Sequence, residues 1–192
     1  MAVEATDLNF DLNYAPVTLA VTNGSLALNQ APQTRNQLDW TLAVNQAGAP
    51  FDLSVEAFTS LHIEGYASVN FDDLLTVDGN FVLDQFDLGD VSGAGDGYAQ
   101  LGSGATGLAL KLQVSGGLPE GAVSGSGTLQ LLQLTNSAGT ESWLGVEATG
   151  LNFDLDYSPV TLAVINGSLA LNQAPAGKAK LNWSAATTAP YN

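Results

Sequence analysis

The sequence predicts an all-β protein made of hairpin-rich antiparallel sheets. Apolar and polar residues alternate along most of the 192 residues, which is the pattern of strands with one buried face. Short stretches rich in Gly, Ser, Asn and Asp separate the alternating runs, as turns do. No helical pattern of about 10–15 residues intervenes, which argues against a parallel sheet with crossover helices.

The chain contains an internal repeat. Residues 3–32 and 146–175 carry the same residue at all but four of 30 aligned positions, with an offset of 143. The four differences are Asp7/Gly150, Asn13/Asp156, Ala15/Ser158 and Thr22/Ile165. The same offset aligns Trp40 with Trp183. The sequence therefore divides into one full period, 1–145, and the start of the next copy, 146–192, equivalent to 3–49.

The repeated segment predicts a strand followed by a hairpin. In DLNFDLNY, at residues 7–14, apolar residues occupy the even positions and Asp or Asn the odd ones, which predicts a half-buried strand. Residues 17–30, VTLAVTNGSLALNQ, contain two alternating runs joined by Asn23-Gly24. Since Asn-Gly accepts positive φ at both central positions of a tight turn, it predicts a hairpin here. Asn166-Gly167 predicts the same hairpin in the second copy.

The remainder of the period predicts further strands. They are expected at 38–44, 51–58, 61–71, 74–88, 108–116, 127–136 and 141–148. Asp78-Gly79, within 74–88, predicts another tight turn. The segments SGAGDG and SGGLPEGAVSGSG are rich in turn residues and separate the later strands.

Two arrangements of the copies fit this pattern. The first is an elongated, solenoid-like repeat stack, in which the apolar faces run on from one copy to the next. The second is a string of β-sandwich beads. No Pro-rich or charged linker separates ESWLG from the VEATG that opens the second copy, and this continuity favours the stack.

The composition excludes several classes of partner. Four Lys and Arg stand against 19 Asp and Glu, for a formal net charge of −15. Such a surface repels nucleic acid and anionic lipid headgroups. No apolar run is long enough for a membrane-spanning helix, so we expect no membrane insertion. The start MAVEATDLNF lacks the pattern of a signal peptide, and any export signal is expected elsewhere in a longer parent. The chain has no Cys, which excludes disulfides and thiolate chemistry.

An acidic, glycine-rich stretch is the candidate metal site. LDQFDLGDVSGAGDG carries Asp84, Asp87, Asp90 and Asp96, and carboxylates in such a loop can surround calcium. The stretch matches neither the EF-hand nor the calcium β-roll pattern, and each Asp can instead hydrogen-bond its own backbone in a turn. Calcium is the one cofactor considered.

The single histidine, His62, is expected on the exposed face of a strand rather than in a catalytic triad.

Three strings carry a family resemblance: NGSLALNQ, GYASVNFDDLLTVDGNFVLDQF and LQVSGG. They resemble repeats of very large, repetitive bacterial surface proteins, described as giant adhesin-like or haemagglutinin-like. The resemblance implies export, a β-rich fibre and a role in attachment or surface structure. It supplies no catalytic residues.

The sequence thus predicts a structural repeat segment of a large extracellular protein, a stalk, fibre or matrix, and no enzyme. Self-association with adjacent repeats or chains, including filaments, is expected because exposed end strands pair readily. The alternative is a calcium-stiffened adhesin module that binds a surface glycan or protein.

Overall fold

The computed structural model describes residues 1–14, 17–31, 37–42, 53–57, 59–71, 75–88, 98–117, 123–157 and 160–183. These residues form eight long strands and one 3₁₀ helix, η1 (Tyr98–Leu101). The strands are β1 (Ala2–Tyr14), β2 (Val17–Asn29), β3 (Thr59–Phe71), β4 (Leu75–Asp87), β5 (Thr106–Gly117), β6 (Val123–Thr135), β7 (Ser142–Tyr157) and β8 (Val160–Gln173).

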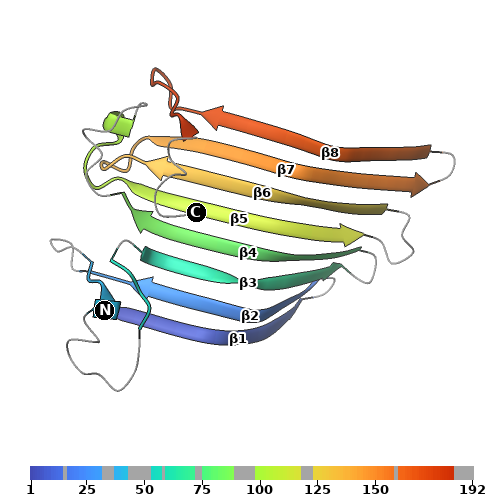
Figure 1. The fold of residues 1–192 in the computed structure, drawn as a ribbon, viewed down its shortest axis with the longest axis horizontal. Coiled ribbons are helices and arrows are strands. Elements are labelled where there is room, and N and C mark those ends of the chain that lie inside the picture. The colour runs from blue at the N-terminus through green and yellow to red at the C-terminus, as the bar shows by residue number, and fades with distance from the viewer. Residues whose placement is uncertain are drawn as a thin grey trace.

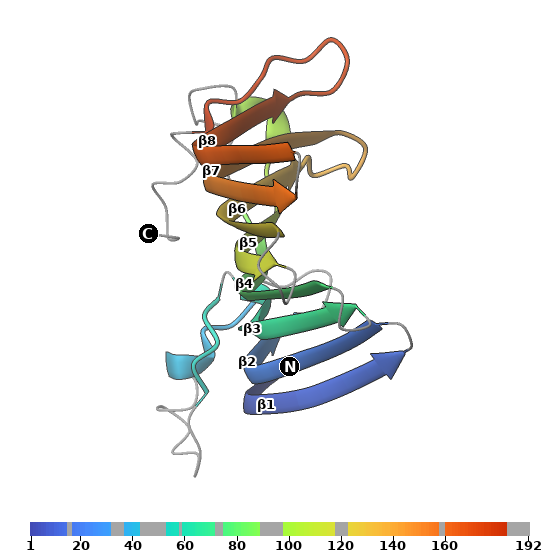
Figure 2. The ribbon, with the colours of Figure 1, turned by 90° about the vertical axis from the view of Figure 1, so that its right-hand side faces the viewer.

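All eight strands belong to one antiparallel sheet whose spatial order is the order of the sequence, from β1 at one edge to β8 at the other (Figure 1). Each of the six inner strands pairs with the strand before it and the strand after it, and the edge strands β1 and β8 pair with one neighbour each. The all-β, antiparallel, hairpin-connected fold is therefore confirmed. Seen from the side, the strands rise one above another with a progressive twist (Figure 2), as expected for a sheet of L-residues. The described strands form one sheet, and neither the solenoid-like stack nor the β-sandwich is confirmed.

The hairpin turns predicted at Asn23-Gly24 and Asn166-Gly167 were wrong. Each dipeptide lies inside one continuous strand, β2 or β8. Asn23 and Asn166 do adopt positive φ, at 51° and 54°, but the glycine that follows each does not. A type I′ turn needs positive φ at both central residues, whereas a single left-handed residue produces a β-bulge. The ladder between β2 and β3 accordingly shifts between Thr22 and Ser25.

The turn predicted at Asp78-Gly79 was also wrong, because β4 continues through it. Gly79 pairs with Val114 of β5 in a ladder without register shifts. A Cβ atom added to Gly79 would lie 2.3 Å from the carbonyl oxygen of Gln113. This glycine therefore allows the backbone of β5 to approach closely, which, besides a bulge, is a common reason for glycine inside a strand.

The strands predicted at 38–44 and 51–58 were wrong in their described parts. Residues 40–42 are helical and 53–56 have no regular structure. The two segments contact each other, since the Trp40 backbone N–H donates to the carbonyl of Val55 (3.0 Å). Short apolar runs do not distinguish strand from other structure by periodicity alone. The other predicted strands correspond to β1, β3–β6 and β7.

Strand alternation gives the sheet an apolar face and a polar face. The apolar face carries every second residue of each strand, and its most exposed large members are Val3, Leu8, Phe10, Leu108, Val114, Phe153, Leu162, Val164, Leu169 and Leu171. These positions extend from β1 to β8, so no second layer of described residues covers the face as a whole. The polar face carries Ser, Thr, Asn, Gln and charged side chains on the alternate positions.

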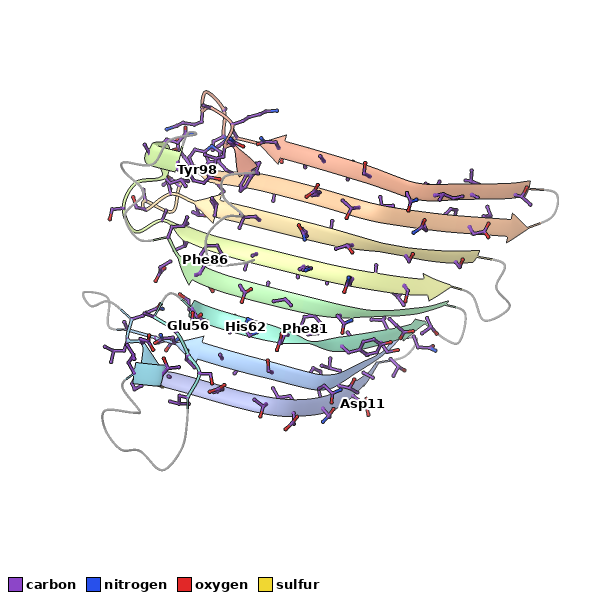
Figure 3. The ribbon with its side chains drawn as sticks, viewed as in Figure 1. Asp11, Glu56, His62, Phe81, Phe86 and Tyr98 are labelled. Carbon is purple, nitrogen blue, oxygen red and sulfur yellow. The ribbon has the colours of Figure 1, made fainter. Side chains whose placement is uncertain are left out.

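The hydrophobic core lies at one end of the sheet, on the polar face. Its buried members are Phe86, Tyr98, Leu101, Ala105, Leu134, Trp143 and Leu181. Phe86 and Tyr98 lie at this end and Asp11 at the opposite end (Figure 3). The Tyr98 hydroxyl donates to the carbonyl of Asn182 (3.0 Å) and the Trp143 indole N–H donates to that of Ala179 (3.0 Å). These bonds hold the chain after β8 over the end of the sheet.

Candidate functional site

The repeated segment forms the same pair of strands at both edges of the sheet. β1 and β2 are the first two strands, and β7 and β8 are the last two. Their registers correspond, as in Leu12↔Leu19 and Leu155↔Leu162, and in Leu8↔Gly24 and Leu151↔Gly167. The sheet therefore begins and ends with the same structural unit.

An asparagine side chain holds the bulge in each copy. Asn9 donates from Nδ2 to the carbonyl of Asp7 (2.9 Å) and accepts the backbone N–H of Asn23 at Oδ1 (3.0 Å). Asn152 makes the two equivalent bonds in the second copy, at 2.8 and 3.1 Å. A bulge interrupts ladder bonds, and this side chain satisfies the backbone groups that are released.

Asn29, at the end of β2, joins three parts of the chain. Its side chain is 1% exposed, and Nδ2 donates to the carbonyls of Leu38 (2.9 Å) and Glu56 (3.0 Å). Its Oδ1 accepts the indole N–H of Trp40 (2.9 Å). This buried amide therefore has its polar atoms paired, as burial requires.

The equivalent Asn172 is only half satisfied. Nδ2 donates to the carbonyl of Leu181 (2.9 Å), the counterpart of the bond to Leu38. The buried Oδ1 of Asn172 and the buried Nε1 of Trp183 have no hydrogen-bond partner among the described residues. Their counterparts in the first copy, Asn29 and Trp40, bond to each other. The indole of Trp183 instead lies over Gly145, where an added Cβ would approach it to 2.7 Å.

His62 is paired with carboxylates on the polar face. Nδ1 lies 2.5 Å from Oδ1 of Asp84, and Nε2 lies 3.8 Å from Oε2 of Glu64. The hydrogen bond with Asp84 is the main cause that raises the pKa of His62 above its ordinary 6.5, and the two nearby negative charges add to it against partial burial. The side chain is half-buried rather than exposed as predicted, although it lies on the predicted face.

This histidine is poorly placed for nucleophilic catalysis. In a triad, one ring nitrogen accepts the proton of a hydroxyl or thiol and the other bonds to a carboxylate. Here each ring nitrogen faces a carboxylate. The nearby Ser25 hydroxyl donates to Oε1 of Glu64 (3.2 Å) instead. The arrangement is that of a cross-strand ion pair.

The predicted calcium residues are not assembled by the described part of the chain. Asp84 and Asp87 are three residues apart in a strand without a bulge toward β5, so they lie on opposite faces of the sheet. Asp90 and Asp96 lie outside the described residues. Among the residues that are described, no three His, Asp or Glu side chains are grouped to hold a metal ion.

A shallow depression on the apolar face is the remaining candidate. It has a volume of about 220 Å³ and lies where Gly116 and Gly125 leave a gap between Val77 and Phe153. Ligand pockets are ordinarily larger, at about 300–1,000 Å³, and contain placed polar groups. This depression is a gap in an apolar surface.

No helix of the described residues could cross a membrane.

Sequence reasoning did not single out Asn9, Asn29, Asn152 or Asn172. A signal for them was present, because the pairs Asn9/Asn152 and Asn29/Asn172 recur at the 143-residue offset.

The chain matches no family model, no curated protein and no solved structure.

Proposed function

We propose that this chain is a structural repeat segment of a large extracellular protein, serving as a stalk, fibre or matrix, and that it is not an enzyme. The observation that supports this best is the presence of one strand pair, with one register, at both edges of a single sheet. A further copy that continued the same order would add six strands beyond the present edge. Length would then grow with copy number, as in other repeat proteins.

The extracellular location is supported by the resemblance to bacterial surface repeats and by the acidic, cysteine-free composition. Net charge far from zero keeps a long protein soluble. An antibody against the chain should label intact cells of the source bacterium. Labelling only after the cells are opened would contradict this location.

Self-association with adjacent repeats or chains is the second part of the proposal. It is supported by the apolar face, which the described residues do not cover as a whole, and by the two edge strands β1 and β8, whose outer backbone groups face away from the sheet. Light scattering should detect assemblies larger than one chain as concentration rises. A strict monomer at high concentration would contradict this part.

Melting temperature against copy number tests the proposed function itself. Proteins of one, two and three periods should melt at progressively higher temperatures, because each new interface between copies stabilises its neighbours. Equal melting temperatures would indicate independent beads and would contradict a continuous structural array.

A further inference from the structure

The two copies of the repeated strand differ in their surroundings. β2 lies between β1 and β3, whereas among the described strands β8 has a neighbour only on the side of β7. Residues 17–29 and 160–172 are nevertheless identical except at Thr22/Ile165. Asn23 and Asn166 share a left-handed backbone, and the ladders β1–β2 and β7–β8 shift register at equivalent positions. The outer edge of β8 therefore corresponds to the edge of β2 that pairs with β3 in the same molecule.

The apolar side chains of β8 are more exposed than their counterparts on β2. Val21 of β2 is 6% exposed, whereas the equivalent Val164 of β8 is 41% exposed. Leu169 is 57% exposed, although its counterpart Leu26 is half-buried opposite Ile63 of β3. The same apolar side chains that β3 helps to bury in the first copy are open in the second.

Buried polar atoms give an independent indication. In the first copy, Asn29 bonds to Trp40 and to the carbonyl of Glu56, three residues before β3. In the second copy, the equivalent Asn172 and Trp183 each have a buried polar atom with no partner in the part of the chain that the structure describes. Buried groups of this kind are normally paired. The segment that precedes β3 supplies two bonds of the first site, from the Glu56 carbonyl to Asn29 and from the Val55 carbonyl to the Trp40 backbone N–H. We expect the same two bonds to bring Asn172 and Trp183 into the arrangement in which Asn29 and Trp40 bond to each other.

The differing residue also fits a β3 strand. Thr22 lies opposite Tyr66 of β3. Its replacement in β8, Ile165, is 76% exposed. A β-branched residue opposite an aromatic ring is a favourable cross-strand pair, so a strand with the sequence of β3 would give this side chain a favourable neighbour.

From these observations we infer that the outer edge of β8 is a binding site for a segment with the sequence of residues 53–71. In a continuing array this partner is the next copy of the repeat, so the inference rests on the proposed function. The segment binds antiparallel to β8 in the register of the β2–β3 ladder. Ile63 of the incoming segment then lies opposite Leu169, and Tyr66 lies opposite Ile165.

Amide hydrogen exchange in an extended chain tests this site. The sequence of residues 50–87 is appended directly after Asn192, which preserves the 143-residue offset. The amides of residues 160–173 that point away from β7 should exchange at least about tenfold more slowly than in the original chain, since they gain ladder bonds. The indole N–H resonance of Trp183, assigned with Trp183→Phe, should also shift as that group gains an acceptor.

Two matched substitutions, placed only in the appended segment, define the face and register. The change equivalent to Ile63→Lys would put a charge opposite Leu169 and should abolish the protection. The change equivalent to Ser68→Lys lies on the polar face and should leave it intact. Residues 1–192 keep their own β3, so neither change alters the original sheet.

Unprotected β8 amides in the extended chain would overturn the inference, as would equal protection with both lysine variants. These outcomes differ from failure of the proposed function. If multi-period proteins gain stability while β8 stays unprotected, the copies meet at another surface and only the edge site fails. If β8 is protected while melting temperatures stay equal, the edge site stands and the proposed array fails.

Discussion

Asp7 and Gly150 occupy the same bulge position in the two copies, and both have a left-handed backbone, with φ of 54° and 58°. Left-handed backbone is accessible to Gly and is tolerated by Asp and Asn better than by other residues. One of the four differences between the copies is therefore an exchange between two residue types that suit the same bulge.

This relationship predicts how Gly150 responds to substitution. Gly150→Asp should change the free energy of unfolding by less than about 0.5 kcal/mol, because Asp7 already fills this position in the first copy. Gly150→Val should destabilise by about 1–3 kcal/mol, since a β-branched residue is strained at positive φ. Urea denaturation measures both. Equal effects of the two changes would contradict the requirement for left-handed backbone.

The two buried asparagines should respond unequally to the same change. Asn29→Ala should destabilise by about 3 kcal/mol, because it leaves the indole N–H of Trp40 and two carbonyls without their partner. Asn172→Ala should destabilise by about 1 kcal/mol, because only its bond to Leu181 is lost. Thermal unfolding of both variants provides the comparison. A larger loss of stability in Asn172→Ala than in Asn29→Ala would contradict the conclusion that Asn172 makes fewer hydrogen bonds than Asn29.

Two glycines on the sheet should differ in their tolerance of a methyl group. Gly79→Ala should destabilise by about 1–3 kcal/mol, because the new Cβ would lie 2.3 Å from a backbone oxygen. Gly125→Ala is the control, since its Cβ would approach no heavy atom closer than 3.4 Å, and it should be close to neutral. Comparable destabilisation in the two variants would show that β4 and β5 do not approach so closely at Gly79.

The pair His62–Asp84 predicts a pH dependence of stability. The pKa of His62 is raised in the folded chain above its ordinary 6.5. Its stabilising contribution is therefore fully present below pH 6.5 and is lost as pH rises through the folded pKa. Melting temperature should fall over this interval.

The matched variants for that dependence are Asp84→Asn and Asp11→Asn. Asp84→Asn removes the main cause of the raised pKa and should flatten the profile above pH 6.5. Asp11 is an exposed residue at the other end of the sheet (Figure 3), and its substitution should leave the profile unchanged. A profile that is unaffected by Asp84→Asn would rule out this pair as its source.

Chelation distinguishes the structural proposal from the calcium alternative. Because Asp84 bonds to His62 and points away from the face of Asp87, we expect a chelator to leave the melting temperature unchanged. A decrease of several degrees, reversed by added calcium, would instead favour a calcium-stiffened adhesin module. Asp90 and Asp96 would then be the next residues to substitute.

The fold class was predictable because strand alternation is local. The run LHIEGYASVNF predicted β3 from its period of two, and the polar side of His62 followed from the same alternation. The bulge at Asn23-Gly24 was not predictable from that dipeptide, because Asn has positive φ in a turn and in a bulge alike. The bulge is distinguished from a turn by the strand paired with it, in which Asp7 or Gly150 also has a left-handed backbone.

The edge site depends on contacts that are distant in sequence. Asn29 reads as one more polar residue of a strand, and its bonds to Leu38, Trp40 and Glu56 require the chain between β2 and β3 to fold back. The repeat itself, in contrast, was visible from the sequence, and it is what allows the open edge of β8 to be compared with the filled edge of β2.

Electron microscopy of a three-period protein tests most directly whether copies extend one sheet. Neighbouring strands are about 4.8 Å apart, so six strands per copy should lengthen the particle by about 29 Å for each added period. Regular growth by this amount, with strands across the long axis, is the result that a continuous sheet predicts. Separate beads joined at variable angles, or no regular growth with copy number, would contradict it.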